Sequence, residues 1–187
     1  VVRIWNLDAG TEAASISGTG LNTTLAVSRD GTLLATGSSS PDAQALIWHV
    51  AQDPKVTTQI RYKLQGHTAA VTAMTFSLDS RLLFTGDRNG VGILWDTQTG
   101  EPVGEKLFQH LGSRINAAVF HPNGEDLLIA GDNQIVTWIR LSDRSTRKSF
   151  GHDGFVTRLT ISPNADSFAT VSEYSGGRET RSQLTLW

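Results

Sequence analysis

Five tryptophans recur along the chain at nearly even intervals. They stand at positions 5, 48, 95, 138 and 187, so successive tryptophans are 43, 47, 43 and 49 positions apart. Each lies in a short run of aliphatic and β-branched residues, as in LIWHV (46–50) and GILWDT (92–97). A self-similar period of this length indicates a chain built from copies of one supersecondary unit, each packed against its neighbours.

Each unit contains strand-like runs in the same order. An alternating run and a tight turn come first, and pairs such as Asp30-Gly31 and Pro163-Asn164 account for the reversals. A second apolar run then leads to the tryptophan, and a more polar run such as IRYKLQGH (60–67) follows it. We therefore predict four antiparallel strands per unit, named a to d, with strand a innermost and strand d at the outer edge. The second runs are LLATGS (33–38), LLFTGD (82–87), LLIAGD (127–132) and SFATVS (167–172).

Short dipeptides add a family signature to this pattern. In two units a His precedes the Trp by 28 positions. With these residues the chain resembles the WD-repeat family, in a divergent form similar to repeats of multidomain bacterial signalling proteins. The resemblance implies an all-β fold, a β-propeller of four-stranded antiparallel blades, here as an incomplete arc of about four blades. The residues concerned are Gly66-His67 with Trp95-Asp96, His110 with Trp138, and Gly151-His152.

The repeat divides the chain into five segments of one propeller domain. Residues 1–18 hold strands c and d of a partial blade, and the repeats follow at 19–66, 67–109, 110–151 and 152–187. The last repeat has strands a to c only, which gives 17 strands in all. That number does not close into a ring of whole blades. We expect both ends to be cuts within a longer polypeptide, with the remaining blades in the same longer chain or in another copy.

The resemblance also implies one hydrogen-bonded set of side chains per blade, made of a His, a hydroxyl on strand b, an acid before strand c and the Trp. In repeat 2, Asn89 is assigned to the place of the acid, so the charge that orients the imidazole is expected to be missing. In repeat 3, Ala130 replaces the hydroxyl. Blade packing is therefore expected to depend mostly on apolar contacts. By repeat, the members are Thr36, Trp48 and Asp42; His67, Thr85, Asn89 and Trp95; His110, Asp132 and Trp138; and His152, Thr170 and Trp187.

Composition and motifs argue against several kinds of site. The chain has no cysteine, a formal net charge of −2 and a pI near 6.2, so neither nucleic acid nor a membrane is expected as a partner. Histidines that recur once per repeat favour a structural role over metal binding, and His121 in a turn is interpreted as plain surface. The chain contains neither a nucleophile elbow nor a phosphate-binding loop. We expect no enzyme, no metal and no cofactor.

One connection between strands b and c is the best candidate for binding. The segment EYSGGRETRSQ (173–183) is several residues longer than its counterparts RNG (88–90) and NQ (133–134). Tyr and Arg are enriched at interface hot spots, although a solvated, flexible loop is the open alternative. The insertion at 51–60 would lie on the opposite face and receives no function. By the resemblance, one face carries the candidates Tyr174, Arg178, Arg181, Arg88, Arg114 and Phe155.

These features predict a non-catalytic scaffold that presents one face of the propeller to protein partners. Two alternatives stay open: a sensor or regulatory propeller of a larger multidomain signalling protein, and part of a propeller enzyme whose active site lies outside this segment. The absence of cysteine does not decide the compartment, and we favour the cytoplasm.

Overall fold

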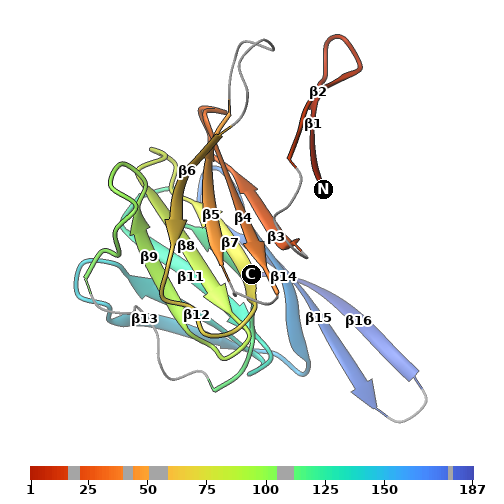
Figure 1. Ribbon diagram of the computed structural model, residues 1–187. Helices are drawn as coiled ribbons and strands as arrows, with labels where there is room; N and C mark the ends of the chain where they lie inside the picture. The colour runs from red at the N-terminus through yellow and green to blue at the C-terminus, as the bar shows by residue number, and fades with distance from the viewer. Residues whose placement is uncertain (17–21, 40–43, 51–58, 105–111, 177–178) are drawn as a thin grey trace.

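The computed structural model describes residues 1–16, 22–39, 44–50, 59–104, 112–176 and 179–187. Within these ranges the regular elements are all strands, and they form five antiparallel sheets (Figure 1). No helix in this part of the chain is long and apolar enough to cross a membrane.

The strands follow one another within each sheet in chain order, so every sheet is a meander of hairpins. The first sheet holds β1 (Val2–Asn6) and β2 (Thr11–Ile16), and the second holds β3 (Asn22–Val27), β4 (Leu33–Ser38), β5 (Ala45–His49) and β6 (Gln59–Leu64). The third holds β7 (Val71–Phe76), β8 (Leu82–Asp87) and β9 (Gly92–Asp96). The fourth holds β10 (Ile115–Phe120), β11 (Asp126–Gly131), β12 (Ile135–Arg140) and β13 (Thr146–Gly151), and the fifth holds β14 (Phe155–Ile161), β15 (Phe168–Gly176) and β16 (Glu179–Leu186).

Burial along the strands explains their composition. Every residue of β4 and β11 is buried, because a neighbouring sheet covers each face of these central strands. Their sequences are therefore continuous runs of apolar and small residues. The outer strands β6 and β13 are mostly exposed, and their sequences are correspondingly polar.

Apolar clusters fill the space between consecutive sheets. Because each cluster is shared by two sheets, every sheet is held in place by its neighbours, as in other repeat folds. Representative members are Val2, Leu34 and Trp48 between the first and second sheets, Ala35, Leu83 and Trp95 between the second and third, Phe84, Ile115 and Leu127 between the third and fourth, and Leu128, Val136 and Val156 between the fourth and fifth.

The innermost strands β3, β7, β10 and β14 contact one another in series. Each begins with a β-bulge. Beside the bulge of β7, Oγ1 of Thr72 donates to the carbonyl of Ile115 in the next sheet at 2.6 Å. In the same way Nδ2 of Asn116 donates to the carbonyl of Val156 at 3.0 Å. These hydrogen bonds, which the sequence did not suggest, join consecutive sheets beside the axis.

The predicted four-stranded antiparallel blades are confirmed, and the second and fourth sheets have all four strands. The strand expected at 104–110 falls largely outside the described residues, as does most of the insertion at 51–60. In Figure 1, β1–β2 and β14–β16 lie apart at the two ends of the stack. The blades therefore form an open arc rather than a closed ring, as predicted.

Candidate functional site

Four side chains form a continuous hydrogen-bonded chain across the third sheet. Nε1 of Trp95 on β9 donates to Oγ1 of Thr85 on β8 at 2.8 Å. Oγ1 of Thr85 lies 2.7 Å from Nε2 of His67, and Nδ1 of His67 lies 2.9 Å from Oδ2 of Asp87. All four residues are buried. These hydrogen bonds hold His67, which precedes β7, against the end of β8.

The donor and acceptor in each of these hydrogen bonds follow from the two end groups, the Asp87 carboxylate and the Trp95 indole N–H. An ionised carboxylate only accepts, so Nδ1 of His67 carries the proton and donates to Asp87. The hydroxyl of Thr85 accepts from Trp95 and donates to Nε2. Burial raises the pKa of Asp87, but the hydrogen bonds from His67 and from the amide of Val91 outweigh burial and hold that pKa below its ordinary value. Asp87 is thus ionised at neutral pH and orients the imidazole.

The acid of this set is Asp87, so the assignment of Asn89 from the sequence is wrong. Asn89 is exposed, and its backbone amide donates to Oδ1 of Asp87 at 2.9 Å. Residues two positions apart on a strand point to the same face, which brings Thr85 and Asp87 together, whereas Asn89 lies in the turn beyond β8. The order Thr-Gly-Asp at 85–87, which parallels Ala-Gly-Asp at 130–132, was the available signal.

The fifth sheet holds a shortened version of the set. Nε2 of His152 lies 2.8 Å from Oγ1 of Thr170, and Nε1 of Trp187 donates to the same oxygen at 3.3 Å. Nδ1 of His152 lies 3.1 Å from the carbonyl of Phe150, so a backbone oxygen stands where the third sheet has a carboxylate. In the second sheet only the Trp48 to Thr36 bond, at 2.9 Å, is formed, and Asp42 lies outside the described residues.

The fourth sheet departs furthest from this pattern. Ala130 offers no hydroxyl, and the buried Nε1 of Trp138 makes no close hydrogen bond among the described residues but helps to lower the pKa of Asp126. His121 is half-buried and stacks on the Trp138 ring at 5.2 Å between centroids, so its interpretation as plain surface is corrected. Oδ1 of Asp132 accepts from Nδ2 of Asn116 at 2.7 Å. His110 lies outside the described residues.

Asp96, the acid of the Trp-Asp signature, belongs to a turn. It ends β9, and its Oδ1 accepts from the amides of Gln98 at 2.7 Å and Thr99 at 3.1 Å. Such side-chain bonds to the backbone two and three residues on stabilise a tight reversal. Asp96 therefore shapes the connection that follows β9.

The connections before the innermost strands and those after the second strands share one edge of the sheets. The amide of Arg88 donates to the carbonyl of Ala70 at 2.9 Å, and the amide of Asp132 donates to the carbonyl of Arg114 at 3.0 Å. In the fifth sheet Phe155 pairs with Glu173 at the corresponding place. We call this edge the connection rim, comprising residues 65–70, 88–91, 112–114, 132–134 and 152–155 with the far end of the β15–β16 hairpin.

The long connection at 173–183 is largely a β-ribbon, so its interpretation as a loop is corrected. β15 and β16 stay paired through Tyr174 with Arg181 and on to Gly176 with Glu179. Figure 1 shows the ribbon extending away from the other sheets. Within this segment Tyr174 and Thr180 are the residues that favour strands, so the sequence carried little signal for the ribbon. Residues 177–178 lie outside the described part of the chain.

The described candidate residues are all exposed. Tyr174 is 56% exposed and Phe155 is 44% exposed. Directly paired residues of a sheet point to the same side, so Tyr174 and Arg181 share one face of the ribbon, whereas Phe155 shares the other face with Glu173. Arg88 and Arg114 lie on the rim at the third and fourth sheets. Arg178 lies outside the described residues.

Neither the rim nor the sheets bring metal-binding side chains together in the described part of the chain. No group of three or more His, Cys, Asp or Glu residues lies close enough there to hold an ion.

Successive antiparallel sheets of up to four strands, stacked around a row of inner strands, define a β-propeller-type repeat protein. A family model described as "WD domain, G-beta repeat" matches residues 58–96. Residues 58–96 thus match a WD repeat, and the chain is similar to WD-repeat proteins, as its residues had suggested.

Three relatives illustrate the range of similarity. Human apoptotic protease-activating factor 1 is 28% identical over 177 residues, covering 91% of this chain and 14% of that protein. Retinoblastoma-binding-like protein E of Dictyostelium discoideum is 31% identical over 149 residues, covering 80% of this chain and 25% of that protein. The WD repeat-containing protein WDS homolog of Arabidopsis thaliana is 28% identical over 149 residues, covering 77% of this chain and 27% of that protein. The chain thus spans about a quarter or less of these relatives.

Proposed function

We propose that this chain is a non-catalytic scaffold that binds protein partners through the connection rim. The observation that carries the proposal is the rim itself. Exposed Arg88, Arg114, Phe155, Tyr174 and Arg181 project from a scaffold whose adjoining connections are joined by backbone hydrogen bonds. A preformed surface loses little conformational entropy when it binds, which favours affinity.

The chemistry of the rim suits a folded partner with acidic side chains. An arginine guanidinium binds a carboxylate through two parallel hydrogen bonds, and tyrosine and arginine dominate the energy of many interfaces. The pairing of Tyr174 with Arg181 places an aromatic ring and a cation on one face of the ribbon. Phe155, on the other face, extends the apolar area. The ribbon therefore offers a contact surface on both sides.

The test compares partner capture by two matched double variants of the chain. The rim variant carries Arg88→Ala and Tyr174→Ala. The control carries Arg81→Ala and Leu78→Ala, which change an exposed arginine and an exposed apolar side chain in the turn between β7 and β8, at the opposite edge of the sheets. Proteins captured from a lysate of the source organism are identified by mass spectrometry, and the affinity of each purified candidate is then measured.

The proposal expects the rim variant to lose about 10-fold or more in affinity for a partner, with the control unchanged. Circular dichroism and urea unfolding establish that both variants fold. Equal affinity of the rim variant and the unchanged chain would contradict binding at the rim. Weaker binding by the control alone would indicate that the interface lies at the opposite edge of the sheets.

A regulatory role within a longer protein is a second candidate. It is favoured by the match to apoptotic protease-activating factor 1, of which the similar region is 14%. The test uses the natural full-length protein with the same two double variants. An activity of another module that changes with the rim variant and not with the control supports regulation, and unchanged activity with lost capture supports a scaffold alone.

A further inference from the structure

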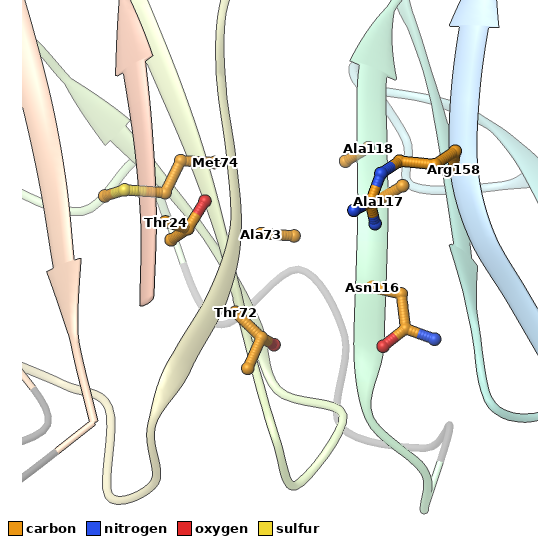
Figure 2. A pocket seen from close by; sticks show the side chains of 8 residues that line it. All are labelled: Thr24, Thr72, Ala73, Met74, Asn116, Ala117, Ala118 and Arg158. Atoms are coloured by element: carbon orange, nitrogen blue, oxygen red, sulfur yellow. The ribbon is translucent and has the colours of Figure 1, made fainter. Parts of the chain in front are cut away.

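The four innermost strands line an open cavity of about 300 Å³ beside the axis (Figure 2). Its lining is drawn from β3, β7, β10 and β14, and most of the lining side chains are small or neutral. The residues that matter here are Thr24, Ala73, Asn116, Ala117 and Arg158. Arg158 is the one charged residue of the described lining.

The register of the inner strands explains why an arginine reaches into this space. Thr24, Ala73, Ala117 and Arg158 each follow the bulge of their own strand, so they occupy one equivalent position in four successive blades. Three of these side chains are small and leave room, while the fourth is long. Figure 2 shows the guanidinium of Arg158 extending from β14 toward Ala117 on β10. Arg158 is exposed, so its guanidinium is open to solvent and to a ligand that enters the cavity.

The charge of Arg158 has no counter-ion in the described structure. None of the ion pairs among the described residues includes Arg158, and its Nη1 donates to the carbonyl of Thr157 at 2.8 Å. A guanidinium has five N–H donors, so several are left for a ligand. Asp132 accepts from Nδ2 of Asn116 at 2.7 Å, and Glu173 accepts from Oγ1 of Thr157 at 3.4 Å. Neither acid is part of the lining.

We propose that this axial cavity binds a single carboxylate group through Arg158. A carboxylate matches the planar fork of a guanidinium and needs only one cation. A phosphate group carries more charge and is usually met by several cations or by a row of backbone amides. The cavity volume accommodates the end of an acidic side chain or the C-terminus of a peptide. The site is distinct from the connection rim, and small probes test it without any partner.

The experiment is a titration of the ¹⁵N-labelled chain followed by NMR. The probes are an acetylated tripeptide amide containing one glutamate, the same peptide with glutamine instead, an acetylated tripeptide with a free C-terminal carboxylate, and inorganic phosphate. Shifts are followed at the backbone amides of Ala117 and Arg158, at the side-chain amide of Asn116 and at the Nε–H of Arg158. We expect one or both carboxylate peptides to shift these signals in a saturable way and the glutamine peptide not to. Comparison of the two carboxylate peptides shows whether the cavity binds an acidic side chain or a C-terminal carboxylate.

Three variants assign the effect to the cavity. Arg158→Gln is expected to weaken carboxylate binding about 10-fold or more, and Arg158→Lys is expected to weaken it less because the charge is retained without the fork. Ala117→Leu keeps the cation and fills the space, so it should also abolish binding. Arg81→Gln removes an exposed arginine in the turn between β7 and β8, outside both the cavity lining and the connection rim, and should leave binding unchanged.

Urea unfolding midpoints are measured for each variant to establish that it folds. The Nε–H signal of Arg158 in the unchanged chain reports carboxylate binding without any substitution. Equal shifts by the glutamine peptide, tighter binding of phosphate than of either carboxylate, or carboxylate binding unaffected by Arg158→Gln and Ala117→Leu would each overturn the assignment. Absence of any shift at millimolar carboxylate would overturn it as well.

Discussion

Nδ1 of His67 lies 2.9 Å from Oδ2 of Asp87, and the two side chains are completely buried. This pair ends the chain of hydrogen bonds that begins at Trp95. Because the bonds run between β9, β8 and the segment before β7, the pair couples the connection rim to the interior of a blade. The rigidity of the rim at residues 65–70 therefore depends on the buried hydrogen bonds between these side chains.

Removal of the Asp87 carboxylate should destabilise the chain strongly. We expect Asp87→Ala to lower the free energy of unfolding by about 2–4 kcal/mol, because the buried imidazole of His67 loses its acceptor. Asn89→Ala is the matched control and should change it by less than about 0.5 kcal/mol, since that side chain is exposed. Urea unfolding followed by tryptophan fluorescence measures both. A large loss with Asn89→Ala would restore the assignment made from the sequence.

The stability contributed by Asp87 should depend on pH with a defined sign. Its pKa is lowered in the folded chain, so the contribution is present above the ordinary aspartate value and is lost as the pH falls through the folded value. We expect the difference in stability between the unchanged chain and Asp87→Asn to be constant above about pH 5 and to shrink below about pH 4. Urea midpoints between pH 2 and 7 provide the measurement. A difference that stays constant down to pH 2 would contradict an ionised Asp87.

The fourth blade should gain stability from a hydroxyl at position 130. Ala130→Thr would place an acceptor where Thr85 and Thr36 accept from their tryptophans. Trp138, which in the structure interacts with Asp126, could then turn its Nε1 to the new hydroxyl. Ala130→Val has nearly the same shape without the oxygen, so the pair separates hydrogen bonding from packing. We expect the Thr variant to be more stable than the Val variant by about 1 kcal/mol. Equal urea midpoints of the two variants would show that Trp138 gains nothing from the hydroxyl.

Gly86 should tolerate no side chain, because the next blade approaches it closely. An added Cβ would lie 2.6 Å from Cγ2 of Ile115 on β10. We expect Gly86→Ala to cost about 1–3 kcal/mol of stability through displacement of that strand. Gly151 on β13 has nothing within 4 Å of an added Cβ, so Gly151→Ala should be neutral or slightly stabilising. Thermal unfolding of the two variants checks the contrast, and similar melting temperatures would argue against close packing of the blades at Gly86.

Much of the fold could be predicted from the sequence, because the same pattern of strands and turns occurs in several units. The alternation and turn residues around each tryptophan recur, so an error in one unit is corrected by the others. The same regularity indicated Thr85, Thr170 and Thr36 as partners of their tryptophans. It failed at Asn89, where spacing along the chain was counted without asking which residues share a face of β8. It also failed at 173–183, where length suggested a loop although β15 and β16 stay paired as far as Gly176 and Glu179.

The sequence by itself determined the period, the antiparallel blade and the family, since hydrophobic periodicity and turn chemistry act over a few neighbouring residues. Only the tertiary structure decided that Asp87 meets His67, that Thr72 and Asn116 bond across to the next blade, and that Arg158 enters an axial cavity. These contacts join residues 20 to 43 positions apart, or depend on the register of bulged strands from several blades. No local pattern carries that information, because it arises only when the blades stack around a shared axis.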